Sequence, residues 1–143
     1  VRTVSGDIRL KNVQGDFRVH STSGNIETAG TGGMVEAHTV SGDMAFSGLV
    51  IRGADSISGN ISLTPAGFAE EVKLTSVSGD IRIRVPSGVN ADLTMNTVSG
   101  DLVNRSGRPL TMTQVSRRQI SGKLGSGGPM IQVRTTSGNV TLE

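Results

Sequence analysis

A six-residue motif recurs eight times along the chain and limits the folds that it can adopt. The motif reads hydroxyl, apolar, Ser, Gly, polar, apolar, as in TVSGDI at positions 3–8, and only the copy that begins at Gln119 lacks the leading hydroxyl. The glycines of successive copies are 16–22 residues apart. A period of this length is typical of a solenoid, in which each repeat is one coil that buries its apolar face against the next.

Strands rather than helices are predicted to form the coils. In the first copy Val4, Ile8 and Leu10 have one parity, and the polar residues between them have the other. A period of two is typical of a strand with one buried face, whereas abundant glycine and β-branched residues disfavour helix. We therefore expect an all-β fold, a single right-handed β-solenoid (β-helix) of about seven coils of 16–22 residues each. Residues 1–143 are expected to form one domain, a portion of a longer chain, because Val1 already lies within a repeat.

Equivalent motif positions are expected to stack, coil on coil, in the order of the sequence. The last motif position predicts one aliphatic column of the core: Ile8, Ile26, Met44, Ile61, Ile81, Leu102, Leu124 and Val140. The structural glycines are expected to occupy a recurring bend that needs positive φ or close backbone approach. They are Gly6, Gly24, Gly42, Gly59, Gly79, Gly100, Gly122 and Gly138.

The polar residue after each glycine predicts a structural ladder. Its members are Asp7, Asn25, Asp43, Asn60, Asp80, Asp101, Lys123 and Asn139. Stacked like charges destabilise neighbouring strands, and an Asn amide can donate a hydrogen bond to a carboxylate beside it. Asp and Asn alternate over the first five copies, which supports the expected stacking. In sequence order Asp80 and Asp101 form the one adjacent acidic pair, and Lys123 follows them.

Composition excludes several classes of function. The chain has no Cys, aromatic residues make up 2%, and the formal net charge is only +2. A nucleic-acid reader would show a basic stripe with stacking aromatics, so no nucleic-acid partner is expected. Eight equivalent serines favour structural repetition over a catalytic triad around His20 or His38. One ladder oxygen per coil is too few for calcium, so we expect no metal, no cofactor and no small-molecule substrate.

The recurring pattern [ST]-[VIT]-S-G-[DN]-[ILMV] covers essentially the whole chain. In its repetition it resembles the bacterial adhesin-like repeat domains of the DUF4097 family. The resemblance implies a β-helix-like domain, usually extracytoplasmic, with no established activity. The bactofilin-type filament proteins are also β-helical but lack the Ser-Gly-Asp signature.

The function expected from the sequence is non-catalytic. We expect a bacterial extracytoplasmic module, in the periplasm or at the cell surface, that is adhesin-like and presents flat solenoid faces to a protein partner or envelope assembly. An accessory subunit docked on a larger membrane or envelope complex is the alternative, and a polysaccharide-active enzyme is the remote one. Membrane association would come only through a partner or a missing anchor. The longer stretches after Thr64, Arg84 and Arg105 are expected to be loops suited to a specific function.

Overall fold

The computed structural model describes residues 1–12, 14–30, 33–48, 50–64, 67–84, 90–105, 110–115, 118–124 and 128–143. Every regular element within these ranges is a strand, so the expected all-β class is confirmed. Of the loops expected after Thr64, Arg84 and Arg105, residues 65–66, 85–89 and 106–109 lie outside the described residues. Residues 67–71 and 110–113 belong instead to the strands β9 (Gly67–Ser78) and β13 (Leu110–Val115), which corrects the loop prediction for them. The handedness, the number of coils and the single domain stay predictions.

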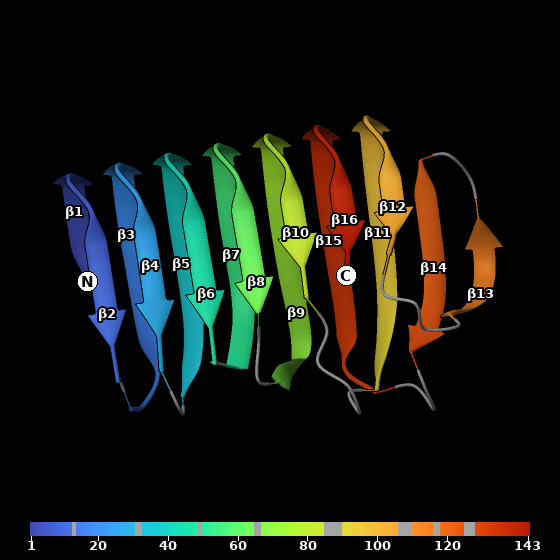
Figure 1. Cartoon of the computed structure of the whole chain (residues 1–143), viewed down its shortest axis with the longest axis horizontal. Coiled ribbons are helices and arrows are strands. Elements are labelled where there is room, and N and C mark those ends of the chain that lie inside the picture. Colours follow the sequence, from blue (N-terminus) through green and yellow to red (C-terminus); the bar gives the residue numbers. More distant parts are fainter. Residues whose placement is uncertain are drawn as a thin grey trace.

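Two open sheets run along the molecule (Figure 1). The nine-stranded sheet contains β1 (Arg2–Ser5), β3 (Phe17–Ser23), β5 (Met34–Ser41), β7 (Val50–Ser58), β9 (Gly67–Ser78), β11 (Ala91–Ser99), β13 (Leu110–Val115), β14 (Gln119–Leu124) and β15 (Met130–Ser137). The seven-stranded sheet contains β2 (Ile8–Lys11), β4 (Ile26–Ala29), β6 (Met44–Ser47), β8 (Ile61–Thr64), β10 (Ile81–Ile83), β12 (Leu102–Asn104) and β16 (Val140–Leu142).

Each short strand follows a long strand across a Ser-Gly corner, and we call such a pair of strands a tier. Neighbouring tiers pair in parallel in both sheets, which is the arrangement of a solenoid. The corner glycines have φ between +121° and +149°, a region that side chains with a Cβ rarely adopt. A Cβ on Gly24 would also overlap the carbonyl oxygen of Gly6 in the tier before it. Both the bend and the close stacking therefore require glycine at this position.

The tiers do not stack in the order of the sequence, which corrects our expectation. The last tier, β15–β16, lies between β9–β10 and β11–β12 and pairs in parallel with both, as Figure 1 shows. Asn139 therefore lies between Asp80 and Asp101, and the expected adjacent acidic pair does not exist. In space the ladder reads Asp7, Asn25, Asp43, Asn60, Asp80, Asn139, Asp101. Alternation thus extends over every tier.

The copy that begins at Gln119 is not a corner, which corrects the prediction for Gly122, Lys123 and Leu124. This copy is the straight strand β14, which pairs antiparallel with β11 and places Gly122 opposite Leu93 and Lys123 opposite Asp92. The reason lies in its sequence. Gln replaces the leading hydroxyl, and a Lys side chain has no oxygen that could accept a hydrogen bond from the next tier.

A thin aliphatic core fills the space between the sheets. The predicted column holds for six of its members, which lie at most 7% exposed: Ile8, Ile26, Met44, Ile61, Ile81 and Val140. Leu102 is partly buried and packs against the same core. The long strands supply the facing side chains, such as Ala37, Leu74 and Val133, each at most 1% exposed. Burial of such columns in every tier provides the main stabilisation of the stack.

Candidate interaction surface

The corner turns the apolar residue of the motif outward and the hydroxyl inward. The motif hydroxyls are at most 5% exposed at Ser21, Thr39, Ser56, Ser76, Thr97 and Thr135. Val4, which we expected to share the buried face with Ile8, is 70% exposed. A hydroxyl in this place can donate to the carbonyl two residues on, as Thr39 Oγ1 does to Ser41 at 3.4 Å. The parity changes within the motif because the Ser-Gly corner absorbs one residue.

This reversal leaves a stripe of aliphatic side chains on the outer face of the nine-stranded sheet. Val40, Ile57 and Val77 lie side by side on β5, β7 and β9 and are 45%, 52% and 45% exposed. We call these three residues the apolar ridge. At the same motif position, Thr136 on β15 ends the ridge and separates it from Val98 on β11. Adjacent exposed aliphatic residues of this kind favour contact with another macromolecule.

A charged hollow of about 1010 Å³ lies below the apolar ridge on the same face. Gly53 lies in its floor, because the row of outward side chains that includes Glu36 and Lys73 has no side chain at this position. The side chains that line the hollow include Glu36, Arg52, Asp55, Glu71 and Lys73. A smaller groove of about 260 Å³ follows the ridge itself and shares Asp55 with the hollow.

A chain of polar contacts links the side chains between the ridge and the hollow. Arg18 Nε lies 3.0 Å from Glu36 Oε2, and the other oxygen of Glu36 lies 3.4 Å from His38 Nε2. His38 Nδ1 lies 2.8 Å from Asp55 Oδ2, and the ring of His20 lies 4.9 Å from that of His38. These residues belong to three neighbouring strands, β3, β5 and β7, so the contacts link side chains across the sheet.

The arrangement around His38 lacks the parts of a nucleophilic site. A His–Asp pair activates a hydroxyl only if the second ring nitrogen faces that hydroxyl. Here His38 Nε2 faces the carboxylate of Glu36 instead. Within the described ranges, no group of three or more His, Asp or Glu side chains is placed to hold a metal ion. The surface is therefore described best by its shape and charge.

The ladder forms a second continuous feature along the Ser-Gly corners. In each step the side-chain Oδ1 accepts a hydrogen bond of 2.9–3.1 Å from the backbone N–H of the next ladder residue. We expected the Asn amide to be the donor, whereas the donors in the structure are backbone N–H groups. Asp and Asn serve equally as acceptors, so their alternation reduces charge repulsion without loss of a hydrogen bond.

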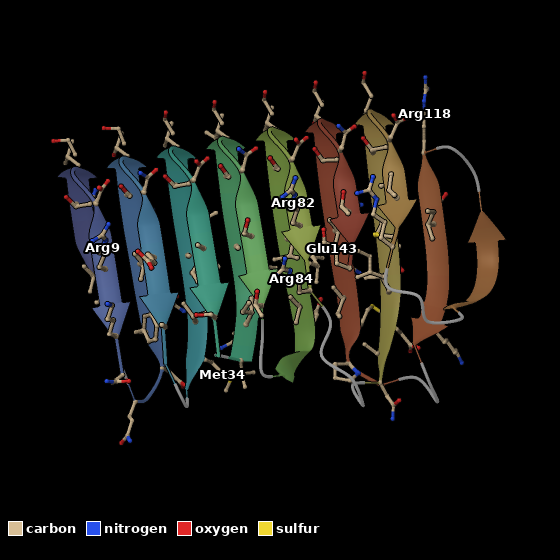
Figure 2. The ribbon with its side chains drawn as sticks, in the orientation of Figure 1. Arg9, Met34, Arg82, Arg84, Arg118 and Glu143 are labelled. Carbon is tan, nitrogen blue, oxygen red and sulfur yellow. The ribbon has the colours of Figure 1, made fainter. Side chains whose placement is uncertain are left out.

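The outer face of the seven-stranded sheet carries several arginines. Figure 2 shows Arg82 on β10, Arg84 directly after that strand and Arg9 on β2. Arg9 pairs with Glu27 at 3.3 Å and Arg84 with Glu143 at 3.0 Å. Between β2 and β10 the outward residues are mostly small, with Ala45 and Ser62 beside each other. No helix that could cross a membrane is found in the described part of the chain.

Sequence reasoning missed the apolar ridge and the charged hollow. The sequence contained a signal for the ridge. The hydroxyl at the first motif position recurs as regularly as the apolar residue at the second, so the hydroxyl could equally have been assigned to the buried face. The hollow depends on Gly53, Glu36 and Asp55, which lie outside the motif. No repeated pattern marks those positions.

Comparison with known proteins places the whole chain in one family. No curated protein matches the chain, and no solved structure does. The family model described as Toastrack DUF4097 matches residues 1–143. Together with the stacked tiers and the recurring Ser-Gly-Asx corner, this match shows that the chain belongs to the Toastrack DUF4097 family of repeat domains.

Proposed function

We propose that the protein is a non-catalytic, extracytoplasmic structural and interaction module, adhesin-like, that binds a protein partner through the outer face of its nine-stranded sheet. The apolar ridge is the observation that supports this proposal most directly. Its three aliphatic side chains, on adjacent strands, are about half exposed. Of the other described apolar side chains in these strands, Met34 is exposed and Val50 is partly buried, and the rest are buried. A partner that covered the ridge would gain about 1 kcal/mol from each side chain.

The charged hollow adds specificity to the same surface. Glu36, Asp55 and Lys73 each contact a neighbouring charged or imidazole side chain, which reduces the side-chain freedom that is lost when a partner binds. A partner that places a cation near Asp55 and Glu36, and an anion near Lys73, would match this pattern. The proposed contact therefore combines an apolar stripe with a polar margin.

The ridge can be tested by comparing two variants. Ile57→Lys places a charge in the centre of the ridge, whereas Val98→Lys places one at the same motif position beyond Thr136. Each variant would be immobilised and used to capture proteins from native bacterial envelopes. We expect Ile57→Lys to lose capture of the partner at least about tenfold and Val98→Lys to retain it. Equal capture by both variants would exclude the ridge as the contact.

An accessory subunit of a larger envelope or membrane assembly is the second candidate function. The outer face of the seven-stranded sheet favours it, because small side chains such as Ala45 and Ser62 allow a large partner to approach closely. Copurification with a membrane complex after mild solubilisation would support this role. Replacing Ala45 with Arg should then release the protein from the complex, whereas Ile57→Lys should not.

The extracytoplasmic location can be tested separately from binding. A fusion to a reporter enzyme that is active only outside the cytoplasm should show activity in intact cells. Added protease should also reach the protein once the outer permeability barrier is opened. A fusion that is active only in the cytoplasm would contradict the location. It would not test the proposed docking surface.

A further inference from the structure

Gly53 leaves a gap in a row of outward side chains on the nine-stranded sheet. Along this row, Glu36 on β5 and Lys73 on β9 lie on either side of Gly53 on β7. Arg18 continues the row on β3, and Gln132 continues it on β15. Gly53 also lines the charged hollow. The hollow therefore opens at the point where one side chain of the row is missing.

The backbone does not require glycine at this position. The corner glycines have a positive φ, whereas Gly53 does not. A Cβ on Gly53 would lie 3.4 Å from the carbonyl oxygen of Lys73 and 4.0 Å from Cγ of Glu36, which are ordinary van der Waals distances. Glycine inside a strand weakens it and often marks a place where a ligand or another chain approaches closely. Gly53 is therefore explained better by the hollow that it opens than by the fold.

A β-bulge lies beside this gap. In the pairing of β7 with β5, Ile51 is opposite Val35. The next pair is Gly53 and Glu36, so Arg52 has no opposite residue. Bulges of this kind are frequent beside functional sites, where they redirect a side chain. Arg52 is exposed and lines the hollow, so the bulge and the glycine modify the same place on the sheet.

The charges around the hollow favour a cation. Its described lining contains four carboxylates, Asp16, Glu36, Asp55 and Glu71, and two basic side chains, Arg52 and Lys73. Lys73 Nζ lies 3.5 Å from Glu71 Oε1, so its charge is partly balanced within the site. The Asp55 side chain is 48% exposed, and its carboxylate remains accessible beside His38. Glu36 contacts the same His38 ring from the other side, so two carboxylates lie next to the gap.

The lining also favours one kind of cation. Met34, which Figure 2 labels, pairs with Val50 at the start of β5 and β7, and both residues line the hollow. Apolar side chains of this kind can cover the aliphatic stem of a long basic residue. A guanidinium presents its donors in a planar fork that can contact carboxylates on two strands, whereas an ammonium group is a compact point charge. Arginine therefore matches the hollow better than lysine.

We propose that the charged hollow binds one arginine side chain of the protein partner. The aliphatic stem lies over Met34 and Val50, and the guanidinium lies above Gly53 and donates hydrogen bonds to the carboxylates of Asp55 and Glu36. The proposal rests on the proposed function, because the arginine belongs to the partner that covers the apolar ridge. Arginine is also among the residues that contribute most to the binding energy of protein interfaces.

Short peptides test the hollow without the partner. The probes are acetyl-glycyl-X-glycine amides in which X is arginine, lysine or citrulline, and citrulline has the shape of arginine without its charge. Each peptide is titrated at low ionic strength into the isotope-labelled 143-residue chain, and NMR follows the amide shifts of Gly53 and Asp55. The slope of shift against concentration should be about fivefold larger for arginine than for citrulline. Equal slopes for these two, or a slope for lysine that equals that for arginine, would overturn the proposal.

Variants of the protein locate the site. Gly53→Leu fills the gap and should reduce the arginine slope at Asp55 at least about threefold. Gln132→Leu places the same side chain in the same row two strands away and should retain the slope. Asp55→Asn preserves the shape and should reduce the slope at Gly53 by a similar factor. Retention of arginine binding in both Gly53→Leu and Asp55→Asn would overturn the proposal.

The stability of a smaller substitution tests why glycine occupies this position. Gly53→Ala should leave the midpoint of urea unfolding unchanged or raise it, because the backbone tolerates a Cβ there. A lower midpoint would show that the fold itself requires the glycine, which would overturn the proposal.

One further variant distinguishes a failure of the hollow from a failure of the ridge. Ile57→Gln changes the ridge without adding a charge beside Asp55, so it should reduce capture of the partner and leave the arginine slope unchanged. Arginine binding without any captured partner would contradict the proposed function and support the hollow as an arginine site. Capture that Ile57→Gln reduces and Gly53→Leu does not would overturn the arginine site and leave the ridge as the contact.

Discussion

The buried hydroxyls at the corners have two different environments. Thr39 Oγ1 donates to the carbonyl of Ser41, whereas Thr97 Oγ1 is buried with no hydrogen-bond partner in the described structure. A methyl group has nearly the same size as a hydroxyl, so replacement by Val changes mainly the polarity. Thr97→Val should leave the free energy of unfolding unchanged or raise it by up to about 1 kcal/mol. Thr39→Val should lower it by about 0.5–1 kcal/mol. Urea unfolding of both variants measures the difference, and equal losses would contradict it.

Asn139 lies between two carboxylates, and a substitution that changes only its charge tests the role of this position. Asn139→Asp keeps the oxygen that accepts the N–H of Asp101 but creates three adjacent acidic side chains with Asp80. We expect the free energy of unfolding to fall by about 1–2 kcal/mol at low ionic strength and to recover largely in 1 M salt. Asn139→Ala removes the acceptor instead, so its loss should not depend on salt. Unfolding curves at the two salt concentrations distinguish the two cases, and a salt-independent loss in Asn139→Asp would contradict the charge explanation.

The tier could be predicted from the sequence, but the order of the tiers could not. The motif indicated the corner, the strands and the column from Ile8 to Val140, because stacking requires the same residue types in every copy. The spacing of copies says nothing about which tier lies beside which. Only charge contained that information, since Asp80 and Asp101 were an unfavourable pair in sequence order. In the structure Asn139 lies between these two residues. The copy at Gln119 obscured this order, because it repeats Ser-Gly but has no side-chain oxygen at the ladder position. The charged hollow was unpredictable because Gly53 and Asp55 do not recur.

The corner glycines provide a test of how closely the tiers stack. Gly138 and Gly6 have similar backbone conformations, with φ of +144° and +121°. A Cβ at Gly138 would overlap the carbonyl oxygen of Gly79, whereas one at Gly6 meets open space. Gly6→Ala should therefore lower the free energy of unfolding only by the cost of its φ, about 1–2 kcal/mol. Gly138→Ala should lower it by at least about 1–3 kcal/mol more, because two backbones must separate. Thermal or urea unfolding of the pair measures this difference, and equal losses would show that the tiers can move apart without cost.

The whole molecule is a row of tiers in which contacts are made between neighbours. In such a row, stability is the sum of the tiers' own stabilities and the interfaces between them. Among the described residues, the first tier, β1–β2, has one interface, with β3–β4. The last tier of the sequence, β15–β16, has two and is enclosed by tiers that are contiguous in the chain. Residues 130–142 are therefore held in the interior of the stack, where their release requires two interfaces to open.

This difference predicts an unusual order of amide hydrogen exchange. Strands that are paired on one side only open at a lower free energy than strands paired on both sides. The amides of β15, such as that of Val133, should therefore exchange among the slowest in the 143-residue chain, because this strand pairs with both β9 and β11. The amides of β1 should exchange among the fastest, since opening them breaks one interface only. Exchange followed by mass spectrometry at several pH values would measure both strands in one experiment. The variant Asn139→Asp should accelerate exchange in β15 and leave β1 unchanged. Rapid exchange of β15 in the unaltered protein would contradict the enclosed position of the last tier.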